Sequence, residues 1–74
     1  MSRRSYRGFE IDVKVFPLRD EPGWSSQACV ERHEGESIRT WKLASPGACL
    51  EESAAMERAF EQARLFIDTL AEGR

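Results

Sequence analysis

Cysteine and histidine are the residues best suited to metal binding, and this 74-residue chain has three of them, Cys29, His33 and Cys49. Cys29 and His33 fall in the same phase of an extended segment, and Cys49 lies in a later loop. Structural zinc usually takes four ligands, often with a close Cys-x-x-Cys pair, which is missing here. Residues four apart in a strand are also about 13 Å apart, too far to bind one ion. The sequence therefore predicts neither a metal site nor a cofactor.

Acid–base or nucleophilic catalysis would have to centre on His33, the single histidine. A catalytic nucleophile needs a base within hydrogen-bond reach and a concave site, whereas His33 lies beside a charged turn with Glu31 and Glu34 as neighbours. The five glycines are dispersed along the chain and form no phosphate-binding loop. We therefore expect a non-enzymatic protein without catalytic residues. A small-molecule enzyme with an unidentified site is the third hypothesis.

Basic residues cluster once in the sequence, at Arg3, Arg4 and Arg7. The net charge of −2 is unlike the basic balance that is typical of a dedicated nucleic-acid binder. The predicted C-terminal helix also has a predominantly acidic arc, which would repel phosphate. Nucleic-acid binding is therefore the alternative hypothesis: a weak accessory role that uses these arginines together with Lys14 and Lys42 on an open sheet face.

Three segments of the chain have the pattern of β-strands. Residues 9–15 alternate strictly between apolar and charged residues. Residues 24–33 resume an extended pattern after a turn rich in proline and glycine, and residues 37–43 are rich in β-branched and aromatic residues. A short turn around Gly35 joins the last two segments. We expect a three-stranded antiparallel β-meander.

The segment 51–70, EESAAMERAFEQARLFIDTL, predicts an amphipathic helix. Its apolar residues recur with the helical period, and its charged residues occupy a neighbouring arc. A helix of this length spans about 30 Å, enough to cover one face of a three-stranded sheet. The predicted fold class is therefore α+β with the order β-β-β-α, the helix being packed on one sheet face. Residues 1–5 have no periodic apolar positions and are predicted to be a flexible tail before a single domain at 6–74.

Other proteins, or a second copy of this chain, are the partners that the sequence favours. A domain of this size has a barely sufficient core, for which self-association is a common remedy. One helix leaves the second sheet face bare, and exposed aromatic residues there would be favoured contacts. We expect a homodimer or a complex with an unidentified protein, formed by strand-edge pairing or through the open sheet face. The candidate contacts are Phe16, Trp24, Ile38 and Trp41, with Leu65 on the outer side of the helix.

The expected location is the cytoplasm. No apolar signal-peptide core follows Met1, and no run approaches the roughly 18 apolar residues of a membrane span. Cys29 and Cys49 could form at most one disulfide, and in the cytoplasm both thiols are expected to be reduced.

Several short motifs resemble those of a group of small uncharacterised bacterial proteins. They are YRGFEIDVKV, GW before the extended ACVER, and a terminal AMERAFEQARLFID that closes with Ala63, Arg64, Ile67 and Asp68. The resemblance spans residues 6–68 and implies a β-β-β-α core similar to HicB-type antitoxins and to the sheet and second helix of double-stranded-RNA-binding domains. The RNA-binding family has an additional N-terminal helix and a lysine-rich start to its last helix. HicB-type antitoxins commonly have a separate DNA-binding segment, and this sequence matches none of these three features.

Overall fold

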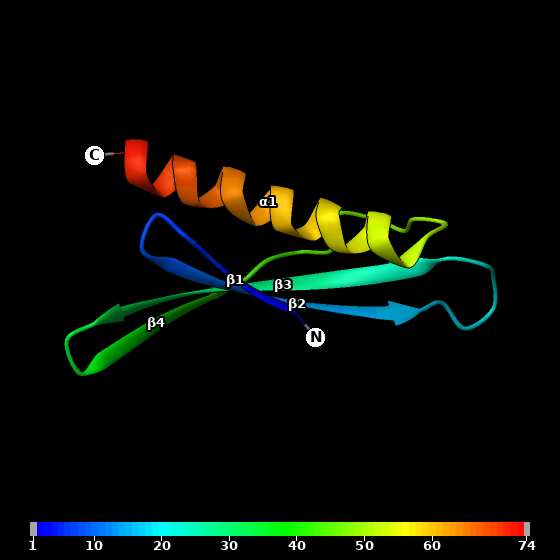
Figure 1. The fold of residues 1–74 in the computed structure, drawn as a ribbon, viewed down its shortest axis with the longest axis horizontal. Coiled ribbons are helices and arrows are strands. Elements are labelled where there is room, and N and C mark those ends of the chain that lie inside the picture. Colours follow the sequence, from blue (N-terminus) through cyan, green and yellow to red (C-terminus); the bar gives the residue numbers. More distant parts are fainter. Residues whose placement is uncertain (1, 74) are drawn as a thin grey trace.

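The computed structural model describes residues 2–73. They form a four-stranded antiparallel sheet in the order β1-β2-β3-β4, with one helix across one face (Figure 1). The elements are β1 (Ser2–Tyr6), β2 (Phe9–Pro17), β3 (Trp24–Glu34), β4 (Ser37–Lys42) and α1 (Glu52–Glu72). Each strand pairs with the next one along the chain, so the sheet is a meander of the α+β class, as predicted.

The prediction of three strands is wrong, because the sheet has a fourth strand, β1. Residues 2–5 of this strand belong to the segment 1–5 for which the sequence predicts a flexible tail; Met1, the other residue of that segment, lies outside the described residues. β1 pairs with β2 in a register that places Ser2 opposite Val13. Backbone pairing needs no apolar alternation, and the burial pattern of β1 shows none, since its three central residues are exposed. For this reason the apolar pattern of the sequence does not reveal the strand.

A two-residue turn makes the β1–β2 hairpin possible. Tyr6 lies opposite Phe9, and the turn between them consists of Arg7 and Gly8. Both turn residues have positive φ angles, 52° and 84°, as a type I′ turn requires. This turn type matches the right-handed twist of the flanking strands, and Gly8 adopts the conformation without steric cost.

The hydrophobic core lies between α1 and the inner face of the sheet. On β2 the period-two alternation turns Phe9, Ile11 and Val13 inward, where all three are buried. Strand β3 adds the buried Ala28 and Val30. The helix contributes Ala55, Ala59, Phe60, Ala63 and Ile67, all fully buried. The small alanine side chains let the helix backbone lie close to the sheet, while Phe60 and Ile67 fill the space between them.

The chain between β4 and α1 passes along the free part of β3. Trp24 and Cys49 exchange two backbone hydrogen bonds: the Trp24 N–H donates to the Cys49 carbonyl at 2.7 Å, and the Cys49 N–H donates to the Trp24 carbonyl at 2.9 Å. Gly23 has a φ angle of 131°, and a Cβ atom there would lie 3.1 Å from the Cys49 carbonyl oxygen. Glycine is therefore required where this segment crosses the start of β3.

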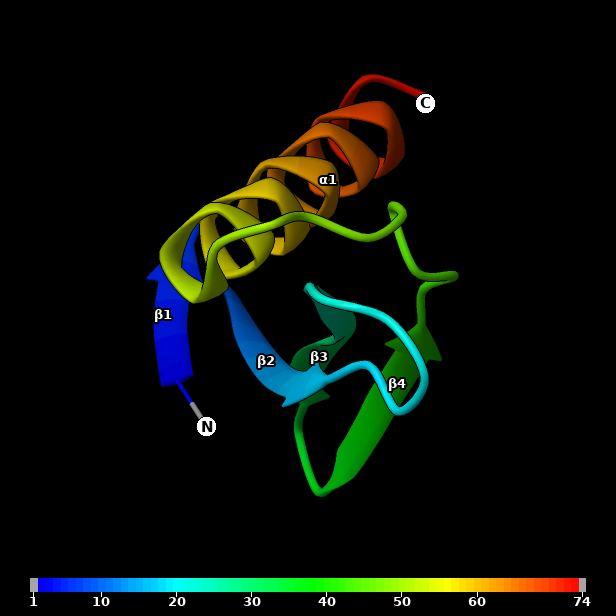
Figure 2. The same ribbon diagram turned by 90° about the vertical axis from the view of Figure 1, so that its right-hand side faces the viewer.

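Strand β4 lies away from the helix. α1 packs against β2 and β3, and the view along the long axis shows β4 on the side of the sheet farther from α1 (Figure 2). Of the six residues of β4, Trp41 alone is partly buried and the other five are exposed. The helix thus leaves one edge of the sheet uncovered.

The close approach of helix and sheet can be tested by enlarging one alanine. Replacing the fully buried Ala59 with leucine should lower the free energy of unfolding by about 1–3 kcal/mol, because the added side chain overpacks the interface. Ala54→Leu is the matched control, since Ala54 lies on the exposed face of the same helix and the change there should be within about 0.5 kcal/mol. Urea unfolding followed by circular dichroism measures both. Equal stability of the two variants would contradict close packing at Ala59.

Candidate functional site

The structure separates the two candidate contacts on the open sheet face. Phe16 and Ile38 are both exposed, at 45% and 57% of their surface. Phe16 lies opposite Ser25 near the start of β3, whereas Ile38 lies opposite His33 near its end. The two apolar side chains therefore stand at opposite ends of the sheet and form no common patch.

Both tryptophans are half-buried on the helix side of the sheet. Trp41 packs between two other aromatic rings, with centroid distances of 6.1 Å to Phe9 and 5.9 Å to Phe66. Trp24 starts β3 beside the Cys49 segment. Trp41 thus packs against the hydrophobic core, while part of its surface remains accessible to solvent.

Two exposed leucines lie away from the sheet edge. Leu65 is 61% exposed on the outer side of α1. Leu50, just before the helix, is 80% exposed and was not among the predicted contacts. Neither side chain belongs to the hydrophobic core or to the residues packed against it.

The cluster Arg3, Arg4 and Arg7 does not form a free basic surface, because each arginine is ion-paired. Arg3 lies on the open face, 2.9 Å from carboxylate oxygens of both Glu10 and Glu31 and 3.5 Å from Asp12. Three carboxylates from β2 and β3 therefore surround one guanidinium. This network ties β1 to the sheet and more than offsets the positive charge of Arg3 on the open face.

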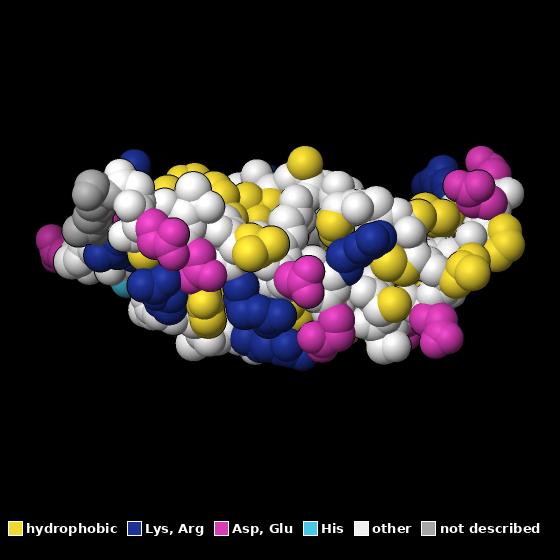
Figure 3. Space-filling model, turned by 90° about the horizontal axis from the view of Figure 1, so that it is seen from above, with side chains coloured by type: hydrophobic (Ala, Val, Ile, Leu, Met, Phe, Trp, Pro, Cys, Tyr) yellow, Lys and Arg dark blue, Asp and Glu magenta, His cyan; other side chains and the backbone are white. Residues whose placement is uncertain are grey.

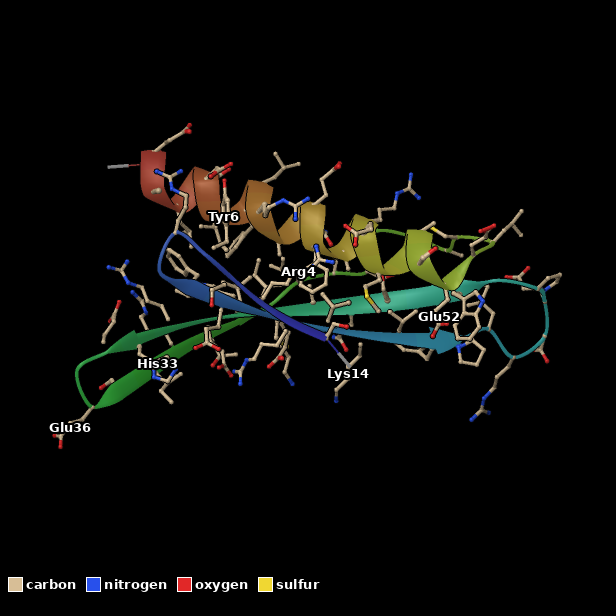
Figure 4. The ribbon with its side chains drawn as sticks, viewed as in Figure 1. Arg4, Tyr6, Lys14, His33, Glu36 and Glu52 are labelled. Atoms are coloured by element: carbon tan, nitrogen blue, oxygen red, sulfur yellow. The ribbon has the colours of Figure 1, made fainter. Side chains whose placement is uncertain are left out.

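Arg4 projects from β1 toward the helix (Figure 4). Its guanidinium pairs with the Glu57 carboxylate at 2.7 Å and lies 4.0 Å from the centroid of the buried Phe60 ring. The hydrogen bond from Arg4 lowers the pKa of Glu57 below its ordinary value. Arg4 thus covers the margin of the core while it carries a paired charge.

Arg7 and Tyr6 both bind Asp68 of α1. The Arg7 guanidinium donates to the Asp68 carboxylate at 2.8 Å, and the Tyr6 hydroxyl donates to the same oxygen atom at 2.9 Å. These hydrogen bonds, that from Arg7 first, lower the pKa of Asp68, and the bond to Asp68 raises the pKa of Tyr6. The arrangement holds the β1–β2 turn against the C-terminal half of the helix. From above (Figure 3), cationic and anionic side chains lie next to one another around the helix rather than in separate patches.

Lys14 and Lys42 lie on the open sheet face, with Lys14 pointing away from the helix (Figure 4). They line a shallow depression of about 410 Å³ together with Cys29, Gln27 and Thr40. Asp12 and Glu31 also line it, so the lysines face carboxylates as well as solvent. The depression has a mixed charge and lacks the exposed aromatic rings that stack on nucleic-acid bases.

Two arginines that the sequence analysis did not select, Arg32 and Arg39, lie together with Arg7 around a groove of about 560 Å³. Arg32 and Arg39 lie opposite each other on β3 and β4. The sequence contains a signal for them. Arg32 lies two residues after Val30, and Arg39 lies two residues before Trp41, so both are in the inward phase of their strands. A charged residue at an inward position indicates that the helix does not cover that part of the sheet.

The cysteines and the histidine considered for metal binding are not gathered into one site in the part of the chain that the structure describes. Among residues 2–73, no group of three or more histidine, cysteine or acidic side chains is placed to hold a metal ion. Cys29 and Cys49 are free thiols. No helix within this range combines the length and the apolar character needed to cross a membrane.

Comparison of the chain with models of protein families, with curated proteins and with solved structures gives no match. The resemblance to HicB-type and double-stranded-RNA-binding proteins therefore stays a prediction. Any function for this chain has to be argued from its own surface.

The Asp68 cluster generates a prediction about pH. Because the pKa of Asp68 is lowered in the folded state, its stabilising effect is complete above the unfolded-state pKa and is lost as the pH falls through the folded-state pKa. Asp68→Asn should therefore reduce the free energy of unfolding most near pH 7, and the difference from wild type should shrink toward about pH 2. Urea unfolding at several pH values measures it.

Glu61→Gln is the control for this pH series, since Glu61 is an exposed helix carboxylate without an ion pair among residues 2–73. Its difference from wild type should be small at every pH. A constant difference between Asp68→Asn and wild type across the acid range would show that the carboxylate charge does not stabilise the fold.

Proposed function

We propose that this protein is a non-enzymatic cytoplasmic interaction domain that forms a homodimer by pairing its β4 strands. The observation that supports the proposal is the exposed β4 edge. The helix packs on β2 and β3, so β4 presents an uncovered strand edge on the far side of the sheet (Figure 2). Unpaired backbone N–H and C=O groups on such an edge are a template for another strand.

The free backbone groups of β4 can be assigned from its register. The Leu43 N–H donates to the Ala28 carbonyl at 3.0 Å. Hydrogen-bonded and non-hydrogen-bonded pairs alternate along an antiparallel ladder, so Trp41, Arg39 and Ser37 also direct their backbone groups toward β3. The outward groups belong to Ile38, Thr40 and Lys42. These three alternate residues supply enough backbone N–H and C=O groups for a short antiparallel pairing.

The side chains of β4 favour one symmetric register. With Thr40 opposite Thr40 of the second copy, Arg39 lies opposite the second copy's Trp41, and Ile38 lies opposite its Lys42. No like charges then face each other, and each arginine meets an aromatic ring. A register centred on Arg39 would instead place two guanidinium groups directly opposite, which is destabilising. The charges on β4 therefore select one pairing and disfavour another.

The other edge of the sheet is a weaker candidate. By the same alternation from its two-residue turn, β1 turns the backbone groups of just Arg3 and Ser5 outward. β1 has five residues and β4 has six.

The small core is a second reason to expect association. Four of its ten buried hydrophobic residues are alanines: Ala28, Ala55, Ala59 and Ala63. A core built from such small side chains buries little apolar surface per residue, and a 74-residue chain is close to the size limit for independent stability. Joining two sheets through β4 would stabilise both copies.

Nucleic-acid binding through Arg3, Arg4, Arg7, Lys14 and Lys42 is less well supported. The three arginines are paired with carboxylates, at closest distances between 2.7 Å and 2.9 Å. Phosphate would have to displace these partners, whereas typical phosphate contacts come from basic residues that face solvent.

Thr40→Pro tests the β4 dimer. Proline removes the outward N–H of Thr40 but none of the hydrogen bonds between β3 and β4, and proline is tolerated on an edge strand. We expect the dissociation constant of the dimer to rise at least about tenfold. Sedimentation velocity over a dilution series measures the dissociation constant.

Thr40→Val is the matched control, because it keeps the β-branched shape and the backbone N–H and should leave the dimer intact. Circular dichroism and urea unfolding of each variant establish that it is folded. A wild-type chain that stays monomeric up to about 1 mM, or a Thr40→Pro variant that dimerises as strongly as wild type, would rule out this interface.

A further inference from the structure

A groove lies beside the C-terminal half of α1, on the helix side of the β3–β4 hairpin. The hairpin extends past the end of the helix and diverges from it (Figure 1), and the groove between them has a volume of about 560 Å³. Arg7, Arg32 and Arg39 line it, and Phe9, Trp41 and Leu70 form its apolar part. This volume lies within the range of about 300–1,000 Å³ typical of small-molecule sites.

The three arginines reach the groove from three different segments. Arg7 is in the β1–β2 turn, Arg32 is on β3 and Arg39 is on β4. Two of them lie over aromatic rings: the Arg32 guanidinium carbon lies 5.3 Å from the Phe9 ring centroid, and that of Arg39 lies 5.4 Å from the Trp41 ring centroid. Such cation–π contacts help to hold a guanidinium in place without using its N–H groups, which remain available to a ligand.

Three arginines and one carboxylate, that of Glu34, line the groove, so its lining is net positive. Arg7 is paired with Asp68 at 2.8 Å, whereas the contact of Arg32 with Glu34 is loose, at 3.8 Å. Arg39 has no ion pair among residues 2–73. The partial negative charge at the helix C-terminus opposes an anion here, but it amounts to about half an elementary charge. Arg32 and Arg39 therefore supply a net attraction on a protein whose overall charge is −2.

We propose that the groove binds the phosphate group of a small phosphate monoester. A phosphate dianion fits two guanidinium groups that are held in place and present their N–H edges, because each guanidinium can donate two parallel hydrogen bonds to it. The Leu70 side chain at the end of the helix offers an apolar contact for the organic part of the ester.

A nucleic-acid strand fits this groove less well than a small molecule. Glu34 lines the groove, and Asp68 and Glu72 act on Arg7 at its margin. Carboxylates on either side would repel the neighbouring phosphates of a polynucleotide, whereas a single phosphate between Arg32 and Arg39 is repelled mainly by Glu34, whose charge the two guanidinium groups outweigh.

A titration of the full chain with phenyl phosphate, followed by amide chemical shifts in two-dimensional NMR, tests the proposal. We expect saturable shifts at Arg32, Arg39 and Trp41. Arg32→Gln and Arg39→Gln should each raise the dissociation constant about tenfold or more, the usual effect of losing hydrogen bonds to a charged group. Arg32 is not an edge residue, so its variant reports on the groove independently of β4 pairing.

Arg19→Gln is the matched control, because Arg19 is an exposed arginine in the β2–β3 loop and its loss changes the net charge by the same amount. It should alter binding less than about twofold. Parallel titrations with benzoate and with a short single-stranded oligonucleotide should give weaker binding than phenyl phosphate. The proposal is overturned by an absence of saturation, by equal weakening in Arg19→Gln, or by tighter binding of benzoate or of the oligonucleotide.

Discussion

The burial of one sheet face beneath a single helix is the constraint on which the rest of this structure depends. α1 lies close to β2 and β3 because Ala55, Ala59 and Ala63 face the sheet with small side chains. Close packing forms a dense core, but one helix is only about 10 Å wide and cannot cover four strands that are about 4.8 Å apart. One edge must stay open. The exposed β4 edge results from this limit, whereas the groove forms where the β3–β4 hairpin extends past the end of the helix and diverges from it (Figure 1).

Arginine stabilises the fold in one place and is proposed to bind a phosphate group in another. At the N-terminus, Arg3, Arg4 and Arg7 each meet a carboxylate of a neighbouring strand or of the helix. These pairs attach β1 to the sheet and to α1. Arg32 and Arg39 rest instead on aromatic rings, and their contacts with carboxylates among the described residues are loose or missing. An arginine is thus a structural residue where carboxylates surround it, whereas its N–H groups remain accessible where it lies over an aromatic ring.

Strand β4 contributes to both proposed sites, because its successive residues alternate both in the direction of their side chains and in the direction of their backbone N–H and C=O groups. Arg39 and Trp41 direct their side chains to the groove and their backbone groups to β3. Thr40, between them, directs its backbone groups to the free edge. One short strand can therefore line a ligand groove with its inward side chains and offer its outward backbone groups for pairing. In the register centred on Thr40, two grooves would lie on the same side of a joined sheet.

Most local elements of this protein can be predicted from its sequence. Period-two alternation predicts the strand at residues 9–15, and the helical period predicts the helix at residues 51–70. Both periods arise because one face of each element is apolar and buried. Strand β1 escaped the sequence analysis because its stability comes from pairing with β2 and from ion pairs such as Arg4 with Glu57, which are distant in the chain. Alternation places Arg32 and Arg39 in the inward phase, and their charge indicates that the helix does not cover them, but it does not predict the groove between the helix and the hairpin. Which part of a face is covered depends on the twist of the sheet and on the position of the helix across it. Tertiary structure alone decided those two features, and with them the open edge and the groove.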